Sequence, residues 1–142
     1  MGKKNRIRPI AICLFRQGDR ILVHEGVDTA RGLHFARPLG GGLDFSEHSR
    51  DAVVREIREE LGAEIKDVEQ LGILESIYSY EGEPGHEIVF VYDAHFVDES
   101  LYAKTALMAQ EGKRVFEAHW RSLNELRGNP LVLVPEGLWQ FL

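Results

Sequence analysis

The sequence has a single cysteine and no long hydrophobic run, and each shortage excludes a class of protein. Cys13 alone cannot form an internal disulfide, which fits a reducing compartment. It lies in the apolar run 10–15, so we expect it in the core rather than as a reactive thiol. No apolar segment approaches the ~20 residues that cross a bilayer, and none of signal-peptide type follows the basic residues 1–6. We therefore expect a cytoplasmic protein with no membrane partner.

Internal repeats, low-complexity tracts and long Ser/Pro linkers are also missing. The 142 residues are enough for one hydrophobic core, and 44% hydrophobic with 28% charged residues is an ordinary globular balance. We therefore expect a single domain over residues 1–142.

The sequence also has fewer basic residues than acidic ones. The net charge is −6, and no basic patch of the kind that binds a nucleic-acid backbone stands out. We expect no nucleic-acid polymer as a partner. An anionic substrate would need metal cations or a few local Arg and Lys residues to neutralise it.

Strand and helix patterns intermix along the chain. Strands are expected at 8–15, 21–24, 71–80, 87–96 and 115–120, with turns at 17–19 and 81–85 and an exposed loop at 28–32. The segment 101–110 fits a helix or a loop, and 135–142 fits a short helix that begins at a proline. This mixture predicts an α/β sandwich around a mixed sheet.

A glycine-rich segment precedes the most informative helix. Three glycines within 38–43 predict a backbone that turns tightly or approaches another group closely. Ser46 is the expected N-cap of a helix over about 47–61, with Glu47 and Asp51 in its first turns and Gly62 after its last residue.

Three acids lie side by side on this expected helix. Val53, Val54, Ile57 and Leu61 form an apolar stripe, and Glu56, Glu59 and Glu60 fill the neighbouring arc at spacings of three and four. Like charges at these spacings destabilise a helix by about 0.2–0.5 kcal/mol per pair. Hard divalent cations would explain the cluster, because Mg²⁺ binds carboxylate oxygens and shares its other positions with water and phosphates. By itself the pattern also fits a solvated helix face.

The spacing of the glycine, the acids and the arginine decides between these interpretations. Gly41, five residues, Glu47, seven residues and then the segment 55–62 (REIREELG) resemble the signature of the Nudix hydrolase superfamily. The one departure is Ala63, where the family usually has a bulkier aliphatic residue that packs. The resemblance implies a Nudix-type α/β/α sandwich and the hydrolysis of a nucleoside diphosphate linked to another moiety.

The resemblance also implies roles for individual residues. Glu56, Glu59 and Glu60 are expected to bind Mg²⁺ or Mn²⁺, and the Gly41 carbonyl to complete the coordination. Glu59 is the first choice for the residue that orients or deprotonates the attacking water. Arg55 is expected to hold a carboxylate in position, together with Glu47.

Residues outside this segment are further candidates. Glu111, expected in a loop, could add a catalytic or metal-binding carboxylate, against ordinary exposure. Arg37 could bind a phosphate, against a surface ion pair, and His86 with Glu87 could face the substrate, against a plain turn. Tyr80, with Tyr78 on the same strand face, could stack on a base. Trp120 and Trp139 are expected in the core.

The sequence leaves the substrate open between nucleoside triphosphates, dinucleoside polyphosphates and nucleotide sugars. We therefore expect a small-molecule nucleotide substrate, and a homodimer remains an option. The alternative is a catalytically inactive nucleotide-binding regulatory domain of the same fold. Because such a domain would be expected to have lost some of the acids, the complete set favours the enzyme.

Overall fold

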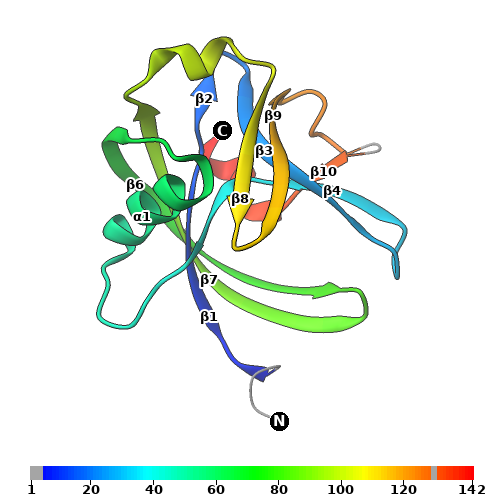
Figure 1. Cartoon of the computed structure of the whole chain (residues 1–142). Coiled ribbons are helices and arrows are strands. Elements are labelled where there is room, and N and C mark those ends of the chain that lie inside the picture. The colour runs from blue at the N-terminus through cyan, green and yellow to red at the C-terminus, as the bar shows by residue number, and fades with distance from the viewer. Residues whose placement is uncertain (1–4, 129–130) are drawn as a thin grey trace.

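The computed structural model describes residues 5–128 and 131–142 (Figure 1). Ten strands, one α-helix and two 3-10 helices follow one another in these residues. The strands are β1 (Arg8–Cys13), β2 (Arg16–Gln17), β3 (Arg20–Asp28), β4 (Leu33–Arg37), β5 (Leu39–Gly42), β6 (Ile65–Tyr80), β7 (Glu83–Phe96), β8 (Ala106–Glu111), β9 (Arg114–Ser122) and β10 (Leu131–Leu133). The helices are α1 (Ser49–Leu61), η2 (Glu99–Ala103) and η3 (Glu136–Phe141).

A four-stranded mixed sheet forms the centre of the molecule, in the order β5-β1-β7-β6. β1 runs parallel to β7 and antiparallel to β5, while β6 and β7 form a long antiparallel hairpin. The run of apolar residues in β1 is buried from Ile10 to Cys13, as expected for a strand covered on both faces. The expected mixed sheet is confirmed.

The remaining strands form a second sheet in the order β10-β4-β3-β9-β8, with β2 paired to β3. β8 and β9 form a hairpin whose strands pair from Ala106 with His119 to Glu111 with Arg114. β10 pairs in parallel with β4 and returns the end of the chain toward the centre.

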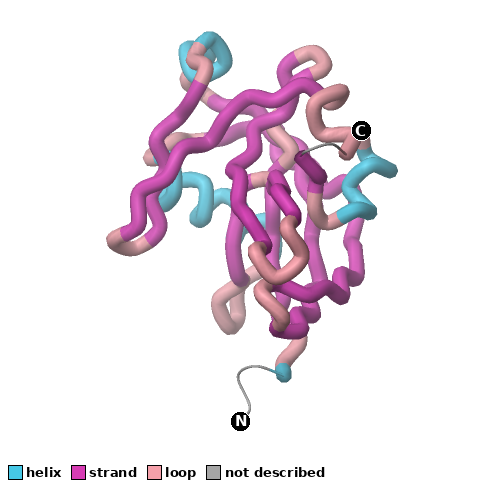
Figure 2. Tube along the Cα trace, turned by 90° about the vertical axis from the view of Figure 1, so that its right-hand side faces the viewer, coloured by secondary structure: helices cyan, strands magenta, loops and turns pink. Residues whose placement is uncertain are grey.

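Two buried clusters lie on the two faces of the central sheet. The first packs α1 and the β8–β9 hairpin against Ala11, Cys13 and Phe15. The second packs β4, β10 and η3 against Ile10, Ile12 and Leu14. Helical segments therefore lie on both sides of the strands (Figure 2). The expected α/β sandwich is confirmed, although its second helical layer is the short 3-10 helix η3.

The amphipathic pattern of the acidic segment accounts for α1. Ala52, Val53 and Ile57 are buried against the first cluster. The helix ends as expected at Gly62, whose φ of 65° lets its N–H donate to the Arg58 carbonyl at 2.9 Å. Ala63 is buried in the same cluster, in agreement with a packing role.

The start of α1 differs from the expectation. His48, not Ser46, is the N-cap, and Ser46 has a φ of 68° in the preceding loop. Glu47 consequently lies outside the helix, and its carboxylate accepts the Asp44 N–H at 2.9 Å. Only Asp51 remains as an acid in the first turn.

The glycine-rich segment is a strand rather than a turn. β5 pairs with β1 through all four of its residues. The glycine at position 40 serves the close approach that the sequence suggested, because a Cβ there would collide with the Ala11 carbonyl and the Ile12 Cα.

Three other expectations about local structure are corrected. Asp28 is the last residue of β3 and fully buried, not part of an exposed loop, because its carboxylate accepts hydrogen bonds from Arg31 and from the Ala30 and Glu81 backbones. The second hairpin turns at 81–82, so the segment 83–85 belongs to β7. The ambiguous segment 101–110 divides between η2 and β8.

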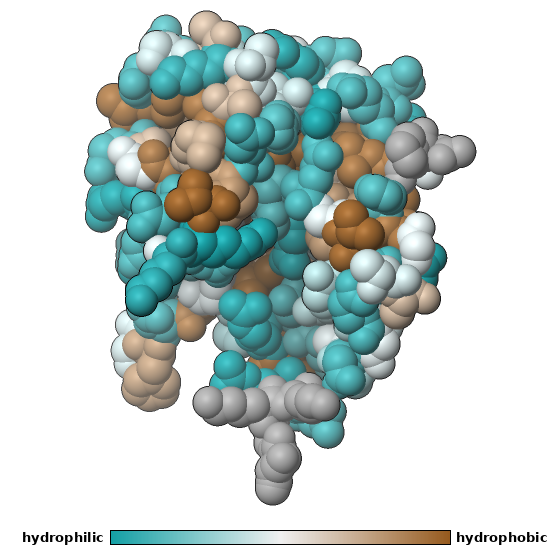
Figure 3. Space-filling model, turned by 45° about the vertical axis from the view of Figure 1, so that its right-hand side comes forward, coloured by the Kyte–Doolittle hydropathy of each residue, from teal (hydrophilic) through white to brown (hydrophobic). Residues whose placement is uncertain are grey.

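No helix in the described part of the chain is long and apolar enough to span a bilayer. One side of the molecule is hollowed along its middle, with hydrophilic atoms in the hollow and hydrophobic residues on both rims (Figure 3).

Candidate active site

The last turn of α1 brings a buried carboxylate onto β5. Glu60 is 8% exposed, although it is an ionisable residue, because it lies on the helix face that packs against the sheet. Its Oε1 accepts the Gly40 N–H at 3.1 Å. Burial raises the pKa of Glu60 to about 8, with further contributions from Glu56 and Glu111.

Glu56 stands one turn earlier on α1 and reaches the next residue of β5. A Cβ at Gly41 would collide with the Glu56 carboxylate in its present position, so a larger residue there would displace the end of the Glu56 side chain. Burial raises the pKa of Glu56; Arg55 opposes the shift, and the negative charges of Glu59 and Glu111 add to it. Glu56 is therefore the carboxylate that interacts with the other acids of the site.

Arg55 ties the helix to the loop before it. It donates to both Glu47 carboxylate oxygens, at 2.8 and 2.9 Å, and to the Gly42 carbonyl at 3.0 Å. The same guanidinium donates to Glu59 at 3.1 Å and lies 3.6 Å from Glu56. These contacts hold the pKa of Glu47 down at about 2.

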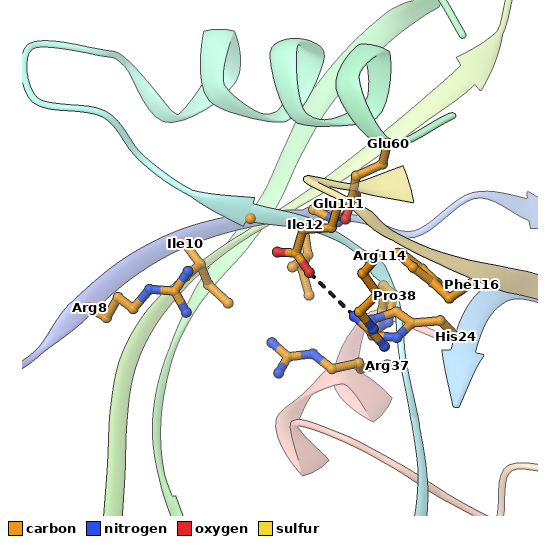
Figure 4. Close-up of a pocket in the computed structure, with 12 residues that line it drawn as sticks. Arg8, Ile10, Ile12, His24, Arg37, Pro38, Glu60, Glu111, Arg114 and Phe116 are labelled. Carbon is orange, nitrogen blue, oxygen red and sulfur yellow. Dashed lines mark hydrogen bonds and ion pairs between the residues drawn. The ribbon is translucent and has the colours of Figure 1, made fainter. Parts of the chain in front are cut away.

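A small cavity of about 130 Å³ opens beside Glu60 (Figure 4). Its walls include Gly40, Gly41 and, from the β8–β9 hairpin, Glu111 and Arg114. Glu111 is the last residue of β8, not a loop residue, and pairs with Arg114 at 3.3 Å. The hairpin thus supplies a carboxylate to the same cavity that receives Glu60 from α1.

The wall opposite the acids is basic. Arg8, Arg37 and Arg114 line the cavity, and Figure 4 shows the Arg8 and Arg37 side chains pointing into it from opposite sides. His24 also lines it; burial lowers the pKa of His24 to about 4, and Arg37 and Arg114 lower it further, so this imidazole is neutral at pH 7. Carboxylates and guanidinium groups therefore face one another across a narrow space.

The matches to known proteins agree with this arrangement. The model of the NUDIX domain matches residues 5–140. The chain belongs to the Nudix family. A MutT NUDIX hydrolase of Burkholderia pseudomallei is 27% identical and superposes with a TM-score of 0.60 over 84% of this chain and 86% of that one. The MutT protein of Bacillus halodurans, at 20% identity and a TM-score of 0.60, shares the fold over 94% of this chain and 79% of its own.

Curated relatives are similar over only part of their length. The NAD-capped RNA hydrolase NudC of Pseudomonas aeruginosa is 27% identical over 121 residues, which are 85% of this chain and 38% of NudC. The corresponding protein of Pseudomonas putida is 34% identical over 67 residues, 47% of this chain and 24% of that protein. The chain thus spans well under half the length of these relatives.

Nudix hydrolases generally use divalent metal ions, and the donor set around β5 fits such an ion. In residues 5–128 and 131–142, no three His, Cys, Asp or Glu side chains converge closely enough to hold one by themselves. Mg²⁺ does not need such a cage, because it is usually bound by one or two carboxylates with water and substrate phosphates. Glu56 and Glu60, placed against the backbone of Gly40 and Gly41, offer this kind of hard oxygen donor.

The three acids of the Nudix box do not share one environment. Glu60 lines the cavity and Glu56 is half-buried beside it. The Glu59 side chain is 57% exposed, does not line the cavity, and contacts Arg55. Glu111, the candidate carboxylate outside the box, lines the cavity with its side chain 68% exposed.

A larger groove of about 800 Å³ adjoins the cavity and shares Arg37 and His24 with it. Tyr78 and Tyr80 line it from β6, which confirms that they share a strand face. Phe35 and Trp139 also line the groove, and Phe35 meets the Tyr80 ring edge-on at 5.9 Å between ring centroids.

The two tryptophans and His86 differ in their burial and in their position relative to the groove. Trp120 is buried in the core as expected, and its indole N–H donates to the Leu101 carbonyl. Trp139 is only half-buried and lines the groove, under the guanidinium of Arg127 at 4.5 Å. His86 lines neither the cavity nor the groove, whereas its neighbour Glu87 lines the groove and is 4% exposed.

Sequence reasoning missed the rest of the basic wall. Arg8 begins β1, Arg114 begins β9, and His24 lies on β3, so the three are far apart in the chain. Arg8 is two residues before buried Ile10 on the same strand face, which is the available sequence signal. Nothing local indicates that these residues meet the acids, because the sheets bring them together.

Proposed function

We propose that this Nudix domain is a divalent-metal-dependent pyrophosphohydrolase that acts on a nucleoside diphosphate linked to another moiety. The observation that carries the proposal is the cavity that Glu60 and Glu111 line together with Arg8, Arg37 and Arg114. A diphosphate needs cations on one side and guanidinium groups on the other, and this cavity provides a place for both.

The acids of α1 are the proposed metal ligands. Glu56, Glu59 and Glu60 with the Gly41 carbonyl would hold Mg²⁺ or Mn²⁺. When bound, the ion neutralises phosphate charge and makes water more acidic. Because burial disfavours the charged forms of Glu60 and Glu56, a cation at this place would be strongly favoured.

Arg55 is the proposed positioning residue of the acids. Its fork binds Glu47 through both oxygens, so the guanidinium is fixed while it contacts Glu59. The attacking water requires a carboxylate at the cavity. Glu111 lines the cavity, although its side chain is 68% exposed, whereas Glu59 does not line it, so we propose Glu111 for the orientation of the water and retain Glu59 as a ligand.

The basic wall and the groove suggest how the rest of the substrate is bound. Arg8 and Arg37 would bind phosphate oxygens. The groove next to them, with Phe35, Tyr80 and Trp139, suits a ring system on the far side of the diphosphate. Nucleoside triphosphates, dinucleoside polyphosphates and nucleotide sugars remain in the proposal, and the name of the NudC relatives adds dinucleotides of the NAD type.

A substrate screen tests this proposal. The protein is incubated with each nucleotide class, with and without Mg²⁺, in ¹⁸O-labelled water, and product masses are recorded. We expect metal-dependent cleavage of at least one diphosphate compound, with the label on the phosphorus that was attacked. Binding without turnover across the whole panel would instead support the inactive regulatory domain.

Capped RNA is tested separately in this screen. The NudC relatives are named for NAD-capped RNA, whereas the net charge of −6 led us to expect no nucleic-acid polymer. A short NAD-capped RNA is compared with free NAD at two salt concentrations. Faster cleavage of the RNA that falls with rising salt would show that the polymer is bound and would overturn that expectation.

A further inference from the structure

A buried acid stands at the junction of the cavity and the groove. Glu87 lies in β7, is 4% exposed and lines the groove. It is the register partner of Arg8 in the parallel β1–β7 pair. A carboxylate is rarely buried this completely unless it is paired, so the groups that contact Glu87 indicate its role.

Two arginines share the Glu87 carboxylate, one on each oxygen. Arg8 Nη1 lies 3.5 Å from Oε2, and Arg37 Nη2 lies 3.7 Å from Oε1. Both distances are longer than those of a direct charge-assisted hydrogen bond. Each guanidinium therefore keeps donors that can turn to another anion.

Arg8 and Arg37 are accessible from the cavity, whereas the Glu87 side chain that they contact is buried. The Arg8 and Arg37 side chains are 50% and 29% exposed, against 5% for Glu87. The far end of Arg8 also reaches β5, where its Nη2 would lie 3.3 Å from a Cβ at Gly42. The pair thus spans the distance from the Nudix box to the groove.

The charge at this junction is positive. Two guanidinium groups and one carboxylate leave an excess of one positive charge. Tyr78 adds a neutral hydrogen bond to Glu87. Without Glu87, the two like-charged side chains would repel one another.

We propose that Glu87 is a positioning residue that holds Arg8 and Arg37 as a two-pronged anion site for the phosphate distal to the Nudix box. The proposal rests on the proposed function and narrows its substrate. The ligand is a diphosphate whose second phosphate carries a ring moiety that lies in the groove, because the anion site stands between the acids and the aromatic side chains.

Binding of α,β-methylene-ADP, a nucleoside diphosphate with a non-hydrolysable bridge, tests the proposal in the presence of Mg²⁺ by calorimetry. The variants are Glu87→Gln, Arg37→Ala, the double variant and Glu87→Asp. Glu75→Gln is the matched control, an exposed acid on the partner strand β6 that lines neither the cavity nor the groove.

We expect Glu87→Gln and Arg37→Ala each to weaken binding about tenfold, since each removes a charge that orders the site. The double variant should lose less affinity than the two single losses combined, because without Arg37 the Glu87 carboxylate has only Arg8 left to position. Glu87→Asp, which keeps the charge, should recover part of the loss, and Glu75→Gln should bind as the unaltered protein does.

Unchanged affinity in Glu87→Gln would overturn the proposal, as would fully additive losses in the double variant. If Glu87→Gln does not fold, Arg37→Ala and Glu87→Asp decide by the same criterion. Since binding is measured without turnover, a protein that binds the probe through these residues but hydrolyses no compound would refute the proposed function and leave this inference standing.

Discussion

At the scale of single residues, Glu60 combines burial with a position against the backbone of β5. The Gly40 N–H is its one direct donor, and the nearby acids add negative charge. Such an arrangement destabilises the charged form unless a cation is present. The fold tolerates this cost at a place where chemistry requires it.

Replacing Glu60 with Gln should remove activity and preserve the fold. The amide oxygen can still accept the Gly40 N–H, while the charge that a metal needs is gone. We expect turnover at least about 100-fold lower, with a thermal midpoint equal to or above that of the unaltered protein. Glu64→Gln, an exposed acid paired with Arg58, is the control. Full activity of Glu60→Gln would show that the site is misassigned.

Glu111 and Glu59 can be distinguished by the same kind of change. Glu111 lines the cavity and Glu59 does not, although both side chains are largely exposed, at 68% and 57%. We expect Glu111→Gln to lower kcat by about 100-fold, and Glu59→Gln to lower it less and to raise the metal concentration needed for half-maximal rate. Steady-state kinetics at several Mg²⁺ concentrations measure both. If Glu59→Gln lowers kcat more than Glu111→Gln does, Glu59 orients the attacking water, as the sequence led us to expect.

At the scale of elements, two contacts fix the parts that frame the site. The Glu47–Arg55 pair fastens the loop before α1 to the helix. At the other end of the molecule, Asp28, Arg31 and Glu81 join the β3–β4 turn to the tip of the β6–β7 hairpin. Figure 1 shows how far apart in the chain these joined segments are.

Low pH should weaken the contact between Glu47 and Arg55. The pKa of Glu47 is held at about 2, below its ordinary value near 4.5, because Arg55 and the Asp44 N–H favour the charged form. A depressed pKa contributes stability that is complete above pH ~4.5 and is lost as the pH falls toward 2. We expect Glu47→Gln to lower the free energy of unfolding by about 1–2 kcal/mol at pH 7.

Urea unfolding across pH 2 to 7 measures this difference. The gap between Glu47→Gln and the unaltered protein should close as the pH falls from 4.5 to 2. A gap that is constant across this range would mean that the carboxylate charge contributes nothing. Glu117→Gln, an exposed acid on β9, provides the comparison.

The second contact controls the end of the groove. The buried Asp28 carboxylate accepts from Arg31, from Ala30 and from the Glu81 backbone, and Asp28→Ala leaves these donors unpaired. We expect faster amide hydrogen exchange at 79–83 and an unchanged rate in α1. Exchange followed by mass spectrometry measures both. If α1 loosens equally, Asp28 stabilises the whole domain rather than the hairpin tip.

At the scale of the whole molecule, the site lies where the two sheets and α1 meet, so metal binding should stabilise the complete fold. A ligand that binds only the folded state raises stability by RT ln(1 + [L]/Kd), about 2.7 kcal/mol at 100 times Kd. We expect Mn²⁺ to raise the thermal midpoint, EDTA to reverse the rise, and Glu60→Gln to abolish it. An equal rise in Glu60→Gln would place the ion elsewhere.

Much of the fold follows from local patterns. The apolar stripe of α1, its end at Gly62 and the buried run of β1 were predictable because each depends on neighbours within a few residues. The start of α1 was not, because Glu47 binds Arg55 from the preceding loop rather than lying in the first turn after a Ser46 cap. The cytoplasmic location, the single domain over 1–142 and the homodimer stay predictions.

The sequence by itself determined the family, the helix that carries Glu56, Glu59 and Glu60, and the close backbone approach in the glycine-rich segment. These follow from spacing within one 23-residue segment, in which helix periodicity and close backbone approach leave few alternatives. Only the tertiary structure decided that Glu60 is buried, that Glu111 shares its cavity, and that Arg8 and Arg37 meet on Glu87. Those residues come from separate strands, and strand pairing over long separations is what places them together.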